Sequence, residues 1–131
     1  MIHGSDLLLR LWFWTPALGY LALIFHLSGQ PLGAWVTPYP DYVLHAAEYF
    51  VLAVLLVRAF NSGLGTAVPD RRLLLTLALC IAYAASDEVH QYFVPGRSAD
   101  YRDVLADGAG AALGLLAVQT GQRLVFRKRL A

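Results

Sequence analysis

The segment SDEVHQYFVPGRSADYRD, residues 86–103, brings carboxylates, a histidine and two arginines close together in the chain. A carboxylate beside an imidazole can transfer protons as a general acid or base, and the same groups can bind a metal ion. A guanidinium can hold a phosphate or a carboxylate through paired hydrogen bonds. This polar segment directly follows the apolar run LLLTLALCIAYAA, so its chemistry lies at the end of an apolar element.

The composition is that of a membrane protein. Of the 131 residues, 58% are hydrophobic and 15% are charged, whereas a soluble domain is typically about a quarter charged. The single cysteine, Cys80, lies inside an apolar run and has no partner for an intrachain disulfide. The basic residues are dispersed at the ends of apolar runs, a pattern that gives no support to a nucleic-acid partner.

Four apolar windows are long enough to cross the bilayer as helices, because a helix of about 20 residues spans about 30 Å of hydrocarbon. The windows are residues 8–27, 42–60, 73–93 and 104–126. No repeat, low-complexity tract or linker separates them. We therefore expect residues 1–131 to form a single all-α domain, a membrane-embedded bundle of four transmembrane helices with the lipid bilayer as its environment.

The distribution of basic residues predicts the orientation of this bundle. Eight of the ten Lys and Arg residues flank the windows on one side of the membrane. By the positive-inside rule that side is cytoplasmic, so both termini are expected inside and two short connections outside. These eight residues are Arg10, Arg58, Arg71, Arg72, Arg123, Arg127, Lys128 and Arg129.

With this orientation, polar residues from several helices meet at the outer ends. They are His45, Glu48, Asp87, Glu88, His90, Gln91, Asp103 and Asp107. An ionisable group inside a membrane costs about 2.5–3.5 kcal/mol near the centre unless it is paired or hydrated. One interpretation is that these groups only hold the bundle together, with His45 paired to Glu48 and Arg97 to Asp103 or Asp87. We favour the other, a polar cavity that opens to the outside.

The last window carries a face that joins acidic residues to glycines. Asp103, Asp107, Gly110 and Gly114 recur at helical spacing, and GAALG is a small-x-x-x-small pattern that lets two helix backbones approach closely. We expect this face to pack within the chain against the second or third helix. A homodimer through the same glycines is the alternative.

Three stretches resemble the VanZ-like membrane proteins. DEVHQYFVPGRSADYRDVLADGAGAALG is similar to the family's signature, PDYVLHAAEYFVLAVLL to its second-span pattern, and FHLSGQP to the loop after its first span. This chain differs at Tyr42, where the family often has Lys, and at Asp107, where it usually has an amide. The positions that match are Asp41, His45, Tyr49, Asp87, Glu88, His90, Gln91, Gly96, Arg97, Asp103, Gly110 and Gly114.

The resemblance implies a small multi-pass protein of the bacterial inner membrane with a role at the cell envelope. Through the family's namesake it also implies a link to resistance against teicoplanin, a lipoglycopeptide antibiotic that acts outside the membrane. The resemblance does not specify a biochemical activity.

Binding is the first of three candidate functions. A lipid-linked envelope molecule or a lipoglycopeptide would be held at the outer face, with Arg97 or Arg102 on its phosphate or carboxylate. The expected ligand-binding residues are Asp41, Tyr49, Gln91, Arg97, Arg102, Asp103 and Asp107.

The second candidate is an intramembrane hydrolase or transferase that acts on an envelope lipid. Its acid–base residues would be His45, Glu48, Asp87, Glu88 and His90, with Arg97 as an anion clamp. A divalent metal held by His45, Glu48, Asp87 and His90 is a variant of this function. No complete metal-ligand spacing is present, so we expect no cofactor.

A transporter is the third candidate and the least favoured. The second window has no charge between Glu48 and Arg58, and the third has none between Arg72 and Asp87. A transport pathway usually needs polar groups across the whole depth of the membrane.

Overall fold

The computed structural model describes residues 4–31 and 38–130. These residues form four helices and no strand: α1 (Gly4–Ser28), α2 (Asp41–Phe60), α3 (Asp70–Tyr92) and α4 (Tyr101–Leu130). Each helix is long and apolar enough to cross a membrane. The prediction of an all-α bundle with four spans is therefore confirmed.

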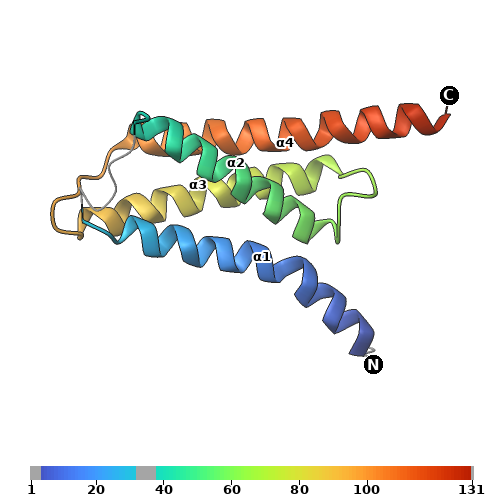
Figure 1. Cartoon of the computed structure of the whole chain (residues 1–131), viewed down its shortest axis with the longest axis horizontal. Coiled ribbons are helices and arrows are strands. Elements are labelled where there is room, and N and C mark those ends of the chain that lie inside the picture. The colour runs from blue at the N-terminus through green and yellow to red at the C-terminus, as the bar shows by residue number, and fades with distance from the viewer. Residues whose placement is uncertain (1–3, 32–37, 131) are drawn as a thin grey trace.

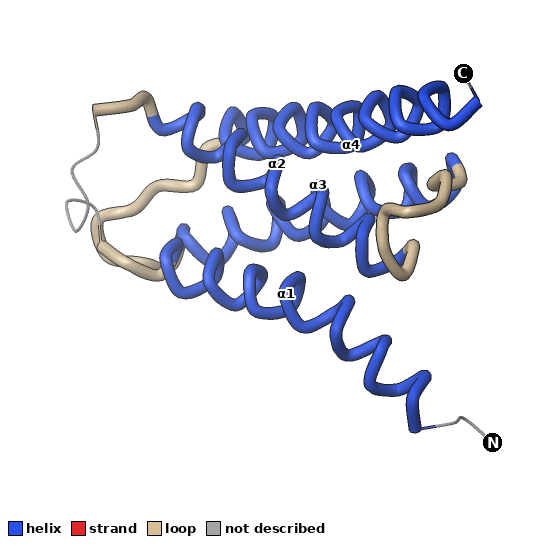
Figure 2. Tube along the Cα trace, turned by 45° about the vertical axis from the view of Figure 1, so that its right-hand side comes forward, coloured by secondary structure: helices blue, strands red, loops and turns tan. Residues whose placement is uncertain are grey.

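The helices run alternately in opposite directions, so the connections lie at two ends (Figure 1). The first and last helical residues lie at the same end as the α2–α3 loop. The α1–α2 and α3–α4 connections lie at the other end, which we call the polar end because residues 86–103 are there. Toward its N-terminus, α1 diverges from the other three helices (Figure 2).

Local sequence explains where α2 and α3 begin. Pro40 and Pro69 immediately precede them, and a proline is tolerated at a helix start because it has no N–H of its own at a position where the helix offers no acceptor. Asp41 and Asp70 then occupy the first turns, where a negative charge interacts favourably with the helix dipole. The start of α2 thus places a carboxylate at the polar end.

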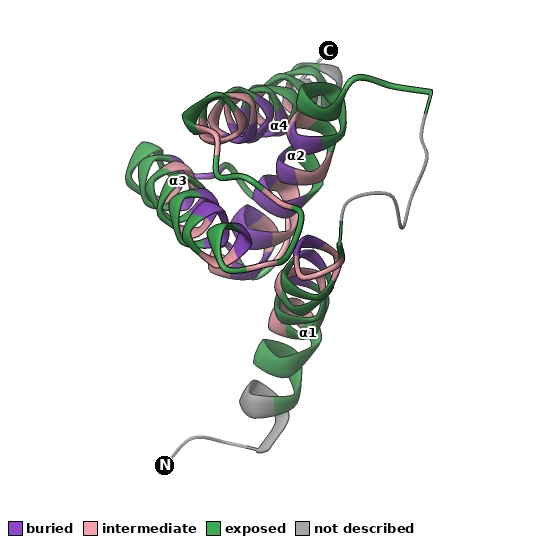
Figure 3. Ribbon diagram, turned by 90° about the vertical axis from the view of Figure 1, so that its left-hand side faces the viewer, coloured by how far each residue is buried: buried purple, intermediate pink, exposed green. Residues whose placement is uncertain are grey.

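The buried residues of α2, α3 and α4 lie on the sides that face one another (Figure 3). The outward sides carry exposed large apolar residues such as Leu74, Leu113 and Leu116. A soluble protein rarely leaves so much apolar surface in water, whereas a bilayer solvates it without cost.

Two glycines allow α4 to contact the backbone of α2. A Cβ on Gly110 would overlap the carbonyl group of Ala46, and one on Gly114 would lie 2.6 Å from the carbonyl oxygen of Phe50. The glycine face is therefore occupied by α2 of the same chain, and a homodimer would have to use another surface. The contact also fixes which residues of α2 and α4 oppose each other nearer the polar end.

Side chains hold the α2–α3 loop at the opposite end. The Asn61 amide donates to the carbonyl oxygens of Gly63 and Thr66 at 3.0 and 3.1 Å. From α4, the Gln122 amide donates to the carbonyl oxygens of Leu64 and Thr66 at 3.0 and 2.7 Å. These bonds satisfy loop carbonyls and tie the loop to the last helix.

Candidate functional site

A pocket of about 370 Å³ lies at the polar end, between the start of α2, the end of α3 and the start of α4. Its three carboxylates and two guanidiniums come from these helices and from the α3–α4 loop. The lining residues are Asp41, Tyr42, Gln91, Arg97, Ser98, Asp100, Arg102 and Asp103. Several of these residues are exposed, so the pocket opens to the surface.

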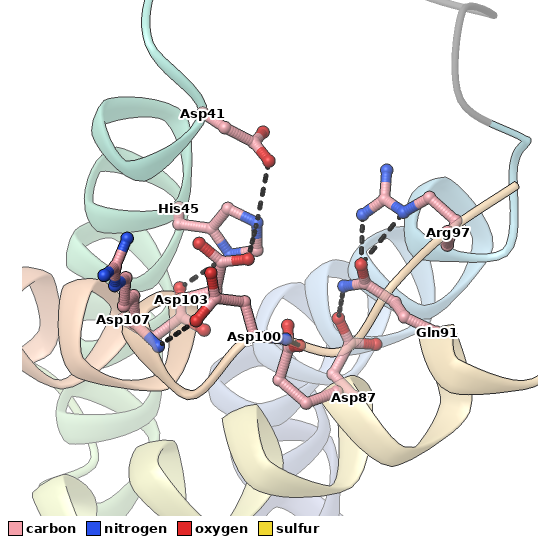
Figure 4. Close-up of polar contacts among 10 residues, drawn as sticks. Asp41, His45, Asp87, Gln91, Arg97, Asp100, Asp103 and Asp107 are labelled. Carbon is pink, nitrogen blue, oxygen red and sulfur yellow. Dashed lines mark hydrogen bonds and ion pairs between the residues drawn. The ribbon is translucent and has the colours of Figure 1, made fainter.

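His45 is the centre of a cluster between α2 and α4 (Figure 4). Its Nδ1 lies 3.1 Å from Oδ1 of Asp107, and its Nε2 lies 4.0 Å from Oδ2 of Asp41 and 4.0 Å from Oδ2 of Asp103. Every ion pair among the side chains of residues 8–31 and 38–127 involves this imidazole. The pairing follows from helical spacing, because Asp41 and His45 share one face of α2 and Asp103 and Asp107 share one face of α4.

The sequence alone suggested Glu48 as the partner of His45. The structure shows Asp107 there instead, because the close contact of α4 with α2 brings Asp107 beside the ring. Glu48 is half-buried and interacts electrostatically with His45, Asp107 and Asp87. It therefore belongs to the same polar region but does not orient the imidazole.

A second network runs from α1 through α3 to the α3–α4 loop. The Ser28 hydroxyl donates to Oδ1 of Asp87 at 2.6 Å, and the Gln91 amide donates to Oδ2 at 3.0 Å. Gln91 Oε1 in turn accepts from Arg97, through Nε at 2.9 Å and also through Nη2. The interpretation in which these groups only hold the bundle together paired Arg97 directly with Asp103 or Asp87. The structure shows an indirect link to Asp87 instead, because the Gln91 amide lies between Arg97 and Asp87.

Two buried polar atoms in this region have no hydrogen-bond partner among the described groups. They are the Tyr49 hydroxyl and Oε1 of Glu88. The other oxygen of Glu88, Oε2, accepts from the Asp100 backbone N–H at 2.8 Å. An unpaired buried polar atom costs about 1–3 kcal/mol, and such atoms often mark a site where something polar binds.

His90 faces a different direction from His45. Its ring stacks on Phe25 of α1 with the ring centroids 4.3 Å apart. Consequently the set of His45, Glu48, Asp87 and His90 does not converge on one point. The group of potential metal ligands that does converge, within the described residues, is Asp41, His45 and Asp103, whose ligand atoms all lie within 4.8 Å of one another.

Two residues of the site were not selected from the sequence. Asp100 lines the pocket with its side chain and bonds to Glu88 with its backbone, and Ser28 anchors Asp87 from α1. Asp100 lies within the polar segment, three residues before Asp103, which is the only signal that could have identified it. Ser28 is 59 positions away from Asp87, so no local pattern connects them.

The arrangement offers two kinds of binding chemistry side by side. Arg97 and Arg102 suit a phosphate or a carboxylate, whereas Asp41 and Asp103, beside His45, suit an amine or a metal ion. The His45–Asp107 pair is also the arrangement of an acid–base group held by a carboxylate.

The family model described as VanZ/LLP1 matches residues 13–124 of the chain. This range includes the whole pocket, the His45 cluster and the glycine contact between α2 and α4. No curated protein and no solved structure matches the chain at a significant level.

Proposed function

The chain belongs to the VanZ/LLP1 family, and on this premise we propose that it binds the phosphate-bearing headgroup of an envelope lipid or lipid-like molecule. The pocket at the polar end is the binding site. The protein resides in the bacterial inner membrane, with both termini in the cytoplasm and the pocket at the outer face. The cations that flank the helices at the opposite end support this orientation, because cytoplasmic ends carry an excess of Lys and Arg.

The main support for this proposal is the position of the two guanidinium groups in the pocket. Arg97 and Arg102 line an open pocket at the end of an apolar bundle, at the depth where lipid headgroups lie. The exposed rings of Tyr42, Tyr92 and Tyr101 are at the same end, and tyrosines are enriched at the membrane interface.

The hydrogen bonds that hold Arg97 support a preorganised anion-binding site. Gln91 is buried and accepts from Nε of Arg97. Its amide donates to Asp87, and Asp87 in turn accepts from the Ser28 hydroxyl. An arginine that is already oriented loses less side-chain freedom when it binds a phosphate, so the affinity is greater than for a free side chain. Arg102 adds a second, exposed cation beside it.

The test compares polyprenyl phosphate with the uncharged polyprenol, using the full-length protein in lipid nanodiscs. We expect saturable binding of the phosphate form and at least a tenfold weaker affinity for the polyprenol. Arg97→Gln should reduce the affinity for the phosphate form about 10–150-fold, since it removes one charge-assisted contact worth about 1.5–3 kcal/mol.

Arg71→Gln is the matched control, because Arg71 is an exposed arginine at the other end of the bundle. It should leave the affinity unchanged. Equal binding of the phosphate and the polyprenol by the unmodified protein would contradict the proposal. In cells, expression should lower susceptibility to teicoplanin, and Arg97→Gln should remove this effect while Arg71→Gln retains it.

A second function, an intramembrane hydrolase or transferase on the same class of lipid, is supported by a separate observation. The buried pair of His45 and Asp107 lies between α2 and α4, and the unpaired Glu88 oxygen is buried in the same region. The nanodisc experiment separates the two functions. Conversion of the polyprenyl phosphate into a new product, lost in His45→Gln, would identify an enzyme, whereas unchanged recovery of the lipid would identify a binder.

Transport is not part of the proposal. The buried charged residues Asp87, Glu88 and Asp107 all lie toward the polar end. Leu56, Cys80 and Leu115 are buried nearer the middle of the bundle, and no buried charged residue among those the structure describes lies beside them. A pathway through the membrane would need polar groups at that depth.

A further inference from the structure

The side of the pocket formed by α2 and α4 has an arrangement that phosphate binding does not explain. The Nε2 atom of His45 faces two carboxylate oxygens, from Asp41 and Asp103, at 4.0 Å each (Figure 4). This distance is too long for a hydrogen bond. Three potential ligand atoms therefore converge without bonding to one another.

The separations are close to those of a metal site. Zinc ligands lie about 2.0–2.2 Å from the ion, so two ligands of a tetrahedral site are about 3.4 Å apart. A movement of each carboxylate oxygen by about 0.6 Å toward Nε2 would bring the two histidine–carboxylate separations to that distance. Asp41 can make this movement because its side chain is 71% exposed, whereas His45 is buried and fixed.

The orientation of His45 is an independent indication. Its Nδ1 lies 3.1 Å from the buried Asp107 carboxylate. In the neutral tautomer whose Nδ1–H donates to that carboxylate, the Nε2 lone pair faces Asp41 and Asp103. A metal-binding histidine almost always donates its other ring N–H to such a carboxylate or carbonyl, which fixes the tautomer and the direction of the ring.

Glu88 on α3 gives a second independent indication. It is 6% exposed, and its Oε1 has no hydrogen-bond partner among the described residues. The charges of His45 and Asp103 both act on this carboxylate, so Glu88 belongs to the same polar region although it lies outside the convergent group. It can accept a hydrogen bond from a metal-bound water.

The charge in this region also favours a cation. The carboxylates of Asp103, Asp107 and Glu88 are buried or half-buried around a single imidazole. Negative groups that are removed from water need a compensating positive charge. Asp41 and Asp103 line the open pocket, which gives an ion a route from the surface.

We propose that Asp41, His45 and Asp103 bind one divalent transition-metal ion of the Zn²⁺ or Mn²⁺ class. Asp107 orients the histidine, and Glu88 accepts a hydrogen bond from a metal-bound water. One imidazole nitrogen with carboxylate oxygens suits these ions better than Mg²⁺ or Ca²⁺, which prefer oxygen ligands alone. This set shares only His45 with the four residues that the sequence suggested for a metal.

Zinc binding is measured directly by calorimetric titration of the tag-free, full-length protein in detergent, after treatment with a chelator and in phosphate-free buffer. We expect one Zn²⁺ per chain. Asp41→Asn and Asp103→Asn should each weaken the affinity at least tenfold, and Asp107→Asn about 10–100-fold, as for other partners of metal-binding histidines. A thousandfold excess of Mg²⁺ should not displace the zinc.

Asp100→Asn is the matched control, since Asp100 lines the same pocket but lies outside the convergent group. It should change the affinity less than twofold. If Asp100→Asn weakens zinc binding as much as Asp41→Asn does, general negative charge holds the ion and the proposal is overturned. It is also overturned if the unmodified protein binds no zinc or binds it equally well after Asp41→Asn.

Unfolding would not explain a loss of zinc binding in Asp41→Asn, because the Asp41 side chain is exposed. In the presence of chelator this variant should unfold at the same temperature as the unmodified protein. X-ray absorption of the zinc-loaded protein should show a single imidazole ligand, and this signal should be absent in His45→Gln. The experiment contains no added lipid, so its outcome is independent of headgroup binding.

Discussion

Gln91 is the residue that connects the buried Asp87 carboxylate to Arg97 and so to the pocket. It is 2% exposed, donates to Asp87 and accepts from Arg97. An amide suits this position because it offers a donor and an acceptor at once, whereas a carboxylate would repel Asp87. The guanidinium of Arg97 is therefore positioned by a neutral group and keeps its charge for a ligand.

Replacing this amide should destabilise the protein. Gln91→Leu leaves Asp87 without one of its two donors and Arg97 without its acceptor, and a buried polar group that loses its partner costs about 1–3 kcal/mol. Reversible unfolding in mixed micelles would measure the change. Gln119→Leu is the control. Gln119 is half-exposed on α4, and its side chain makes no hydrogen bond to the described residues. Equal stability of the two variants would contradict the role given to Gln91.

The contact between α2 and α4 is the element-scale feature that positions the site. Gly110 lies one turn from Asp107, and the carbonyl group that it meets belongs to Ala46, the neighbour of His45. The distance between the two helices at this point therefore sets the distance between the imidazole and its carboxylates.

A single methyl group at this contact should separate the helices. Gly110→Ala overlaps the α2 backbone, which cannot move as a side chain can, so we expect a loss of about 1–3 kcal/mol in stability together with weaker zinc binding. Gly121→Ala on the same helix meets nothing within 4 Å and serves as the control. It should be neutral or slightly stabilising, since alanine is the better helix former by about 1 kcal/mol. Gly110→Ala with unchanged zinc affinity would show that the contact does not position the site.

At the scale of the whole molecule, the two ends of the bundle differ in chemistry. One end has the pocket and its carboxylates, and the other has the Asn61 and Gln122 contacts to the α2–α3 loop. The apolar middle separates them. A protein with one polar end has a fixed direction in the membrane, so its orientation determines which compartment supplies the ligand.

Cysteine labelling in intact cells tests this direction. In a Cys80→Ala background, Ser98→Cys in the α3–α4 loop should react with a membrane-impermeant maleimide, because Ser98 is exposed at the polar end. Thr66→Cys in the α2–α3 loop should react only after the membrane is permeabilised, although Thr66 is also exposed. The reverse pattern would place the pocket in the cytoplasm.

Much of the fold followed from the sequence, because four apolar stretches of sufficient length have few alternatives to four helices. The glycine-bearing face of α4 was also visible, since helical spacing is local. That face also indicated that Asp103 and Asp107 would approach His45 and Glu48 or Asp87 and His90, and the contact of His45 with Asp107 is one of these approaches. The exact partners across helices were not visible, such as His90 stacked on Phe25 and Arg97 bonded to Gln91. These choices depend on how each helix is rotated about its axis, which its own periodicity does not determine.

The position of Asp107 on the last helix has a consequence for biosynthesis. The ribosome makes α2 well before α4, so His45 and Glu48 enter the bilayer before the residues that surround them exist. During this interval they bear the cost of polar groups in lipid, about 2.5–3.5 kcal/mol for an ionised side chain at the bilayer centre and less near its surface. The arrival of α4 removes this cost through the His45–Asp107 contact. Insertion of the final helix is therefore the step that completes both the site and the stable membrane protein.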